Sequence, residues 1–239
     1  MIRILAIGNS FSVDALHYFK QIADAAGIET ECVNLYIGGC SLERHYRNML
    51  SAERAYELQY NGQLTGFKVS LQEALLNRSW DVVTLQQSSP CSTDKDTYFP
   101  YITELYAYVK KCLPKAKILI HQTWAYEDGS DRLYNVAHFD TAAEMFAAVE
   151  DAYAFAAQTI SADGIIPSGK LFRSLLDNGI EKIHRDTYHA SLGLGRYALG
   201  LLWYRTLTGN SVAGNDFHHF DVPIPEEHIQ IAKKCVDSL

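Results

Sequence analysis

Cysteine is scarce in this chain, and the arrangement of the few cysteines excludes a disulfide scaffold. The 239 residues contain five cysteines, which is an odd number, and their positions show no paired spacing: Cys32, Cys40, Cys91, Cys112 and Cys235. Disulfide-stabilised domains carry dense cysteines in even numbers. We therefore expect free thiols in a reducing compartment and a cytoplasmic protein, although the sequence leaves open a signal peptide removed upstream.

Basic clusters and long apolar runs are also lacking. Asp and Glu number 28 against 21 for Lys and Arg, which gives a formal net charge of −7. Nucleic acids and anionic membrane surfaces require a basic face on their partner. No apolar run approaches the roughly 20 residues that span a bilayer. The sequence thus argues against nucleic-acid and membrane partners, and it does not indicate an oligomeric state.

Metal-binding and nucleotide-binding motifs are absent as well. There is no Cys-x-x-Cys, no His-Glu-x-x-His and no acidic calcium loop, and His218 and His219 are adjacent rather than on one helix face. Gly8 is not followed by the further glycines of a dinucleotide-binding turn, and no Walker A lysine occurs. The G-x-S-x-G turn of ordinary α/β-hydrolases is missing too. We expect no metal and no cofactor.

Apolar runs and helix-like segments alternate along the whole chain. The runs predict strands at 3–7, 29–36, 81–85, 117–120 and 164–167. Helical spacing and capping signals predict helices at 14–26, 70–78, 98–113, 142–160, 168–176, 191–208 and 225–236. Asn61-Gly62 predicts a small β-ribbon of 56–60 and 63–69. The pattern favours one doubly wound α/β domain over residues 1–239, whose five-stranded parallel sheet has helices on both faces.

Ser10 lies in the segment Gly8-Asn9-Ser10-Phe11-Ser12, between the first predicted strand and a helix. This position places a hydroxyl nucleophile at the carboxyl edge of the sheet, near backbone N–H groups that can hold the oxyanion of a tetrahedral intermediate. The alternative is that Ser10 or Ser12 only caps the helix, as serine commonly does. The local pattern alone does not decide between these interpretations.

Residues that follow the next strands are expected at the same edge. Gly39 could present a backbone N–H to the oxyanion or simply form a tight turn. Gln86 and Gln87 could supply a side-chain donor or begin a polar loop, and strand alternation allows only one of them to face the site. Gln122 and Trp124 follow the fourth strand, and we expect them to line the pocket.

Asp186 and His189 lie three residues apart near the other end of the chain. The carboxylate can accept a hydrogen bond from imidazole Nδ1, which leaves Nε2 free to act as a base. Asp-x-x-His also occurs by chance, and Asp186 could instead cap the helix predicted from Ser191. Combined with Ser10, the pair completes a nucleophile, a base and a residue that orients the base.

Taken together, these motifs resemble those of the SGNH (GDSL-type) hydrolase superfamily. In that family, Gly-Asp/Asn-Ser follows the first strand, a glycine follows the second, an asparagine block follows the third, and Asp-x-x-His lies near the C-terminus. The matching positions are Gly8-Asn9-Ser10, Gly39 and Asp186-Thr187-Tyr188-His189. Gln86-Gln87-Ser88-Ser89 replaces the third block. With the downstream Gln122-Thr123-Trp124-Ala125, this is similar to an uncharacterised bacterial branch of the superfamily.

The resemblance implies a three-layer, flavodoxin-like α/β/α fold and a serine esterase, commonly one that removes acetyl groups from carbohydrates. It assigns Ser10 as nucleophile, His189 as base and Asp186 as its orienting group. The N–H groups of Ser10 and Gly39, with the amide of Gln86 or Gln87, would form the oxyanion hole. Asn9, Gln122, Trp124 and Tyr188 would bind substrate, with aromatic rings such as Tyr36 and Tyr126 available to stack on a sugar.

The sequence leaves two alternatives to a small-acyl esterase. A lysophospholipase or thioesterase would act on longer acyl chains, and it would need a long apolar groove for which the sequence shows no obvious apolar lid. A non-catalytic carbohydrate-binding domain of the same fold would be expected to have lost Ser10, Asp186 or His189, and all three are present.

Overall fold

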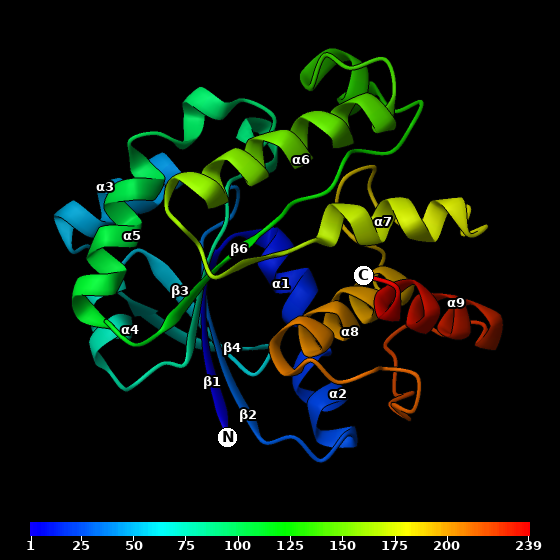
Figure 1. Cartoon of the computed structure of the whole chain (residues 1–239), viewed down its shortest axis with the longest axis horizontal. Coiled ribbons are helices and arrows are strands. Elements are labelled where there is room, and N and C mark those ends of the chain that lie inside the picture. Colours follow the sequence, from blue (N-terminus) through cyan, green and yellow to red (C-terminus); the bar gives the residue numbers. More distant parts are fainter.

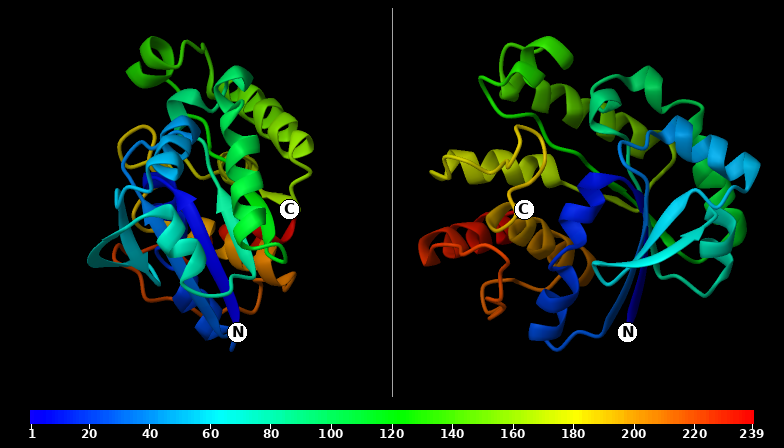
Figure 2. Two further views of the ribbon diagram at one scale, coloured as in Figure 1. Left: turned by 90° about the vertical axis from the view of Figure 1, so that its left-hand side faces the viewer. Right: turned by 180° about the vertical axis from the view of Figure 1, so that it is seen from behind.

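The computed structural model describes residues 1–239, and a seven-stranded sheet with the order β4-β3-β2-β1-β5-β6-β7 runs through it. The parallel strands are β1 (Ile2–Gly8), β2 (Thr30–Tyr36), β5 (Val82–Leu85), β6 (Lys117–His121) and β7 (Gly164–Ile166). The hairpin strands are β3 (Tyr56–Tyr60) and β4 (Gln63–Val69). The sheet has seven strands rather than five because the predicted ribbon pairs antiparallel with β2 and extends the sheet (Figure 2).

Helices cover both faces of the sheet, as expected for a three-layer fold (Figure 1). On one face lie α1 (Ser10–Leu16), α2 (Phe19–Ala25), α7 (Ser168–Asp177), α8 (Leu194–Thr208) and α9 (Glu226–Asp237). On the other lie α3 (Leu42–Ser51), α4 (Leu71–Leu76), α5 (Tyr101–Cys112) and α6 (Ala142–Thr159). Alternation along β1 fills both cores, since Ile4 and Ala6 join the first and Leu5 and Ile7 the second.

Two helices differ from the sequence prediction. The helix expected over 14–26 begins earlier and breaks into α1 and α2 at Tyr18, whose buried side chain donates a hydrogen bond to Leu192 O at 3.2 Å. Helix α3 was not predicted. Its buried face carries His45 and Asn48 beside Leu42, so the apolar periodicity that marks a helix is weak. By contrast, Ser70 and Glu73 form the expected capping box at α4.

The carboxyl ends of the parallel strands lie at one edge of the sheet. Because β1 pairs with both β2 and β5, the loops that follow these three strands meet around the start of α1. Shorter turns add to this edge: 3-10 turns at Ser89–Cys91 and Lys95–Tyr98, and a π-helical turn at Arg132–Val136. None of the helices combines the length and apolar character needed to cross a membrane.

Candidate active site

Asn9, and not Ser10, caps helix α1. The Asn9 Oδ1 atom accepts a hydrogen bond from the Phe11 N–H at 3.0 Å, and its Nδ2 donates to Cys40 O at 3.1 Å and to Gln87 O at 3.4 Å. The Asn9 side chain is thereby buried and joins the loops after β1, β2 and β5. Ser10 is the first helical residue and is only half-buried, so its hydroxyl is not used for capping.

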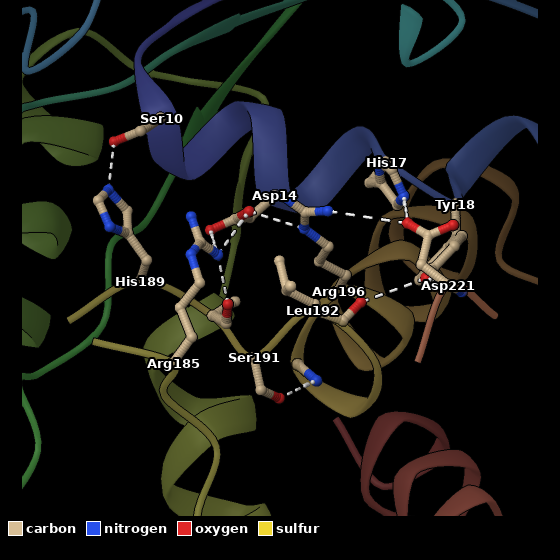
Figure 3. Close-up of polar contacts among 12 residues, drawn as sticks. Ser10, Asp14, His17, Tyr18, Arg185, His189, Ser191, Leu192, Arg196 and Asp221 are labelled. Atoms are coloured by element: carbon tan, nitrogen blue, oxygen red, sulfur yellow. Dashed lines mark hydrogen bonds and ion pairs between the residues drawn. The ribbon is translucent and has the colours of Figure 1, made fainter. Parts of the chain in front are cut away.

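The hydroxyl of Ser10 contacts the imidazole of His189. Ser10 Oγ lies 2.8 Å from His189 Nε2, and His189 Nδ1 lies 2.8 Å from Asp186 Oδ2 (Figure 3 shows the first contact). The other oxygen of Asp186 accepts the His189 backbone N–H at 2.9 Å. Partial burial alone would raise the pKa of the Asp186 carboxyl, but the hydrogen bonds from His189 outweigh it and hold this pKa below its usual value.

A buried carboxylate connects helix α1 to the segment that carries Asp186 and His189. Asp14 is fully buried; Arg185 Nη1 lies 2.8 and 3.0 Å from its two oxygens, and Arg196 Nε lies 2.9 Å from Oδ1 (Figure 3). Arg185 directly precedes Asp186 in the chain. The position of Asp186 and His189 relative to Ser10 therefore depends on ion pairs between residues that are far apart in sequence.

Ser10 and His189 open into a cavity of about 350 Å³ at the carboxyl edge of the sheet. The lining residues are Asn9, Ser10, Phe11, Tyr36, Gly38, Gly39, Ser89, Pro90, Arg132, Tyr188 and His189. Of the predicted site residues, the structure thus brings Asn9, Gly39 and Tyr188 to this cavity together with Ser10 and His189. Sequence reasoning missed both Ser89 and Arg132. Ser89 ends the Gln86-Gln87-Ser88-Ser89 block, where only the glutamine amides were considered as donors, and Arg132 lies in no recognisable motif.

The two glutamines after β5 do not line this cavity. Gln86 Nε2 lies 2.7 Å from His121 Nδ1. Gln87 Nε2 donates to Thr97 O at 3.0 Å and approaches its Oγ1 at 3.2 Å, while Gln87 Oε1 accepts from the Leu42 N–H at 3.0 Å. Both amides therefore hold neighbouring segments together. The expectation that one of them serves the oxyanion is not supported, and Ser89 and Pro90 form the β5 side of the cavity instead.

Gln122, Trp124 and Tyr126 do not line the cavity. Gln122 Oε1 accepts from the Gly169 N–H at 3.1 Å. Trp124 donates from Nε1 to Tyr188 O at 2.8 Å, and its ring stacks on Phe11 with centroids 4.1 Å apart. The prediction that Gln122 and Trp124 bind substrate is not supported, because both side chains are buried and neither lines the cavity.

Ser89 and Arg132 are placed by aromatic side chains. The hydroxyl of Tyr126 donates to Ser89 Oγ at 3.0 Å. Burial raises the pKa of Tyr126, and its hydrogen bonds with Ser89 and Arg132 partly oppose that rise. The guanidinium carbon of Arg132 lies 3.8 Å from the centroid of the Tyr188 ring and 5.6 Å from that of Tyr126. No group of three or more His, Cys, Asp or Glu side chains is arranged to hold a metal ion.

The chain is similar to solved structures over nearly its whole length. A DUF4886 family protein from Bacteroides uniformis is 31% identical with a TM-score of 0.89, and the match covers 99% of this chain and 93% of that one. A protein from Slackia heliotrinireducens assigned to the SGNH hydrolases is 25% identical with a TM-score of 0.64, over 86% and 98% of the two chains. No curated protein matches significantly.

A more distant neighbour shares the fold alone. It is Axe2, an acetylxylan esterase from Geobacillus stearothermophilus, which is 13% identical with a TM-score of 0.55 over 87% of this chain and 94% of that one. These neighbours show that the α/β/α fold is the one found in SGNH hydrolases. The family model described as "Domain of unknown function (DUF4886)" matches residues 3–237. This chain therefore belongs to the DUF4886 family and has an SGNH-hydrolase-like fold.

Proposed function

We propose that this protein is a serine esterase that hydrolyses small acyl esters, with Ser10, His189 and Asp186 as its catalytic residues. The observation that carries the proposal is the chain of two contacts, from Ser10 Oγ to His189 Nε2 and from His189 Nδ1 to Asp186 Oδ2, each 2.8 Å long. Two segments from opposite ends of the chain meet to form it. This is the geometry that a hydroxyl nucleophile needs for activation.

In the proposed reaction, His189 Nε2 takes the proton of Ser10 as Oγ attacks the ester carbonyl carbon. Asp186 accepts the Nδ1–H, which keeps Nε2 unprotonated before the attack and stabilises the imidazolium afterwards. His189 then protonates the departing alcohol oxygen as the ester C–O bond breaks. In the second half, a water oxygen attacks the acyl carbon while His189 Nε2 takes its proton; the bond from Ser10 Oγ to the acyl carbon then breaks, His189 returns the proton to Oγ, and the carboxylic acid leaves.

We assign three donors that line the cavity to the oxyanion. The backbone N–H groups of Ser10 and Gly39 have no protein acceptor, and both residues line the cavity. Gly39 has φ 60°, a conformation that favours glycine. Ser89 accepts from Tyr126, so its own hydroxyl proton is free to point into the cavity. We assign to Ser89 the role that the sequence suggested for a glutamine.

The cavity favours a small acyl group, most simply acetyl, on a carbohydrate alcohol. Its lining includes the rings of Tyr36 and Tyr188, which offer faces for a sugar, and contains no Leu, Ile or Val side chain to hold a long acyl chain. These observations support acetyl-ester hydrolysis over the lysophospholipase and thioesterase alternatives.

The test is hydrolysis of 4-nitrophenyl esters from acetate to octanoate by the wild type, Ser10→Ala and Ser12→Ala. Ser12 is a matched control because it lies in the same motif but contacts Asn9 O and Asn34 Oδ1 rather than His189. We expect a preference for acetate, and a loss of about 10³-fold or more in kcat for Ser10→Ala only. Full activity in Ser10→Ala, or no hydrolysis of any ester by the wild type, would contradict the proposal. A preference for octanoate would favour an acyl-chain hydrolase.

A further inference from the structure

Arg132 places a positive charge in the same cavity as Ser10 and His189. It is half-buried and begins the π-helical turn Arg132–Val136, a local irregularity that is common at functional sites. Its guanidinium lies against the face of the Tyr188 ring, 3.8 Å from the centroid to Cζ. Such packing restricts the side chain while leaving N–H groups available for an in-plane partner.

This charge has no carboxylate partner within the protein. Eight of the other arginines lie within 4.0 Å of an Asp or Glu side chain. The ninth, Arg44, is exposed on α3, whereas Arg132 is partly enclosed by Tyr188 and Tyr126. No acidic residue lines the cavity, so Arg132 is its only permanently charged lining residue.

We propose that Arg132 selects esters that carry a carboxylate close to the scissile bond, and this inference rests on the proposed esterase function. A guanidinium presents two parallel N–H donors that match a carboxylate. Arg132, Ser10 and His189 line one cavity of about 350 Å³, so a carboxylate bound by Arg132 lies close to the ester that Ser10 attacks. Because the proposed acyl group is small and uncharged, the carboxylate belongs to the alcohol part. The substrate class is thus acetyl esters of acidic alcohols, such as acidic sugars.

The Tyr188 ring links this recognition site to the catalytic base. Its centroid lies 3.9 Å from that of the His189 ring, and its backbone oxygen is held by Trp124 Nε1. An alcohol bound by Arg132 would therefore lie one aromatic ring away from the imidazole that protonates the leaving group. A competing role for Arg132 is direct stabilisation of the oxyanion, which would act on every ester irrespective of the charge on its alcohol.

The experiment compares 3-acetoxybenzoate with 3-acetoxybenzamide, in which a neutral carboxamide of similar size replaces the carboxylate, by kcat/KM for the wild type, Arg132→Gln and Arg132→Lys. We expect the wild type to prefer the benzoate by about 10-fold or more, the contribution of one charge-assisted hydrogen-bonded pair. Arg132→Gln should bring the ratio of the two values close to one. Arg132→Lys should keep part of the preference, because lysine retains the charge but not the two-pronged geometry.

Equal kcat/KM values for the two esters in the wild type would overturn the inference. An equal loss on both esters in Arg132→Gln would overturn it as well and would make Arg132 an oxyanion or packing residue. A second readout needs no turnover: calorimetric binding of 3-hydroxybenzoate and 3-hydroxybenzamide to Ser10→Ala. We expect about 10-fold tighter binding of the benzoate, and equal affinities would reject the carboxylate site. If the wild type hydrolyses neither ester but Ser10→Ala still binds 3-hydroxybenzoate more tightly than the amide, the esterase proposal is rejected and the carboxylate site is retained.

Discussion

The serine flank of the cavity differs from the arginine flank in the forces that position its side chains. The serine flank consists of Ser10, Asp186 and His189, and the arginine flank of Ser89, Arg132 and Tyr188. On the serine flank, the buried Asp14 carboxylate and two arginines hold the segment that carries the imidazole against helix α1. On the arginine flank, the contacts are the face of the Tyr188 ring against Arg132 and hydrogen bonds with neutral groups, from Tyr126 to Ser89 and from Trp124 to Tyr188 O, without an ion pair.

This difference matches what each flank is proposed to do. Proton transfer requires heavy atoms held within about 3 Å of each other, and buried ion pairs with several hydrogen bonds impose such geometry. Recognition of an anion requires a cation that is not neutralised by the protein itself. Packing against Tyr188 places Arg132 while leaving its charge without an acidic partner. Three substitutions, Asp14→Asn, Ser89→Ala and His121→Gln, test how these regions are held.

The largest effect is expected from Asp14→Asn on the serine flank. Removing this fully buried charge leaves Arg185 and Arg196 facing a neutral group, which typically costs about 3–5 kcal/mol of unfolding free energy. Because Arg185 adjoins Asp186, the displaced imidazole should also lower kcat about 10-fold or more while KM changes less. Urea unfolding and steady-state kinetics below the transition measure the two effects.

Asp221→Asn is the matched control for Asp14→Asn. Asp221 lies at the outer end of the same network, 4.0 Å from Arg196 and 2.5 Å from His17, but its side chain is 56% exposed. Solvent screening should keep its contribution to stability below about 1 kcal/mol. If folded Asp14→Asn keeps the wild-type kcat, the ion pairs stabilise the fold without positioning His189.

An intermediate effect is expected from Ser89→Ala on the arginine flank. Loss of one oxyanion donor typically costs about 10²-fold in kcat, equivalent to roughly 2.7 kcal/mol of barrier. Gln86→Met is the contrasting variant: it removes the buried amide that contacts His121, so it should lower stability more than it lowers kcat. Kinetics on 4-nitrophenyl acetate and urea unfolding of both variants distinguish an oxyanion donor from a structural amide. The reverse result would return the oxyanion role to the glutamine.

The smallest effect concerns acid stability of the core behind both flanks. Burial lowers the pKa of His121 to about 3, far below the value of about 6.5 in an unfolded chain. Between these values only the unfolded chain binds the proton, so the unfolding free energy falls as the pH decreases from 6.5. From pH 7.5 to 6.0 this one residue should contribute a loss of about 1 kcal/mol.

Urea unfolding of the wild type and His121→Gln at these two pH values tests the prediction. The variant is expected to be less stable overall but to show a smaller difference between the two pH values. An identical pH dependence in both proteins would mean that other groups dominate acid destabilisation, such as His45, whose pKa is also lowered by burial to about 3.

Much of the backbone followed from short-range signals. The hairpin at Asn61-Gly62, the capping box at Ser70 and the strand before Ser10 each depend on neighbouring residues, and the structure contains all three. Helix α3 was missed because polar His45 and Asn48 occupy its buried face, and only the surrounding tertiary structure makes that face internal. Gln86 and Gln87 were predicted to serve the oxyanion for a similar reason. The local sequence does not show that their side-chain amides are buried and bonded to neighbouring segments.

The alternation of strands and helices, and the sheet edge at which Ser10 and Gly39 lie, could be predicted from the sequence. The Asp-x-x-His motif added Asp186 and His189 to the predicted site. These features depend on local backbone preferences and on the period of apolar residues, which a linear chain displays directly. The hydrogen-bond and ion-pair partners of the site residues follow only from the tertiary structure. Asp14 meets Arg185 across 171 positions of the chain, and Tyr126 meets Ser89 across 37. Such contacts depend on how helices pack onto the sheet, because no local pattern specifies which distant side chain will lie within hydrogen-bonding distance.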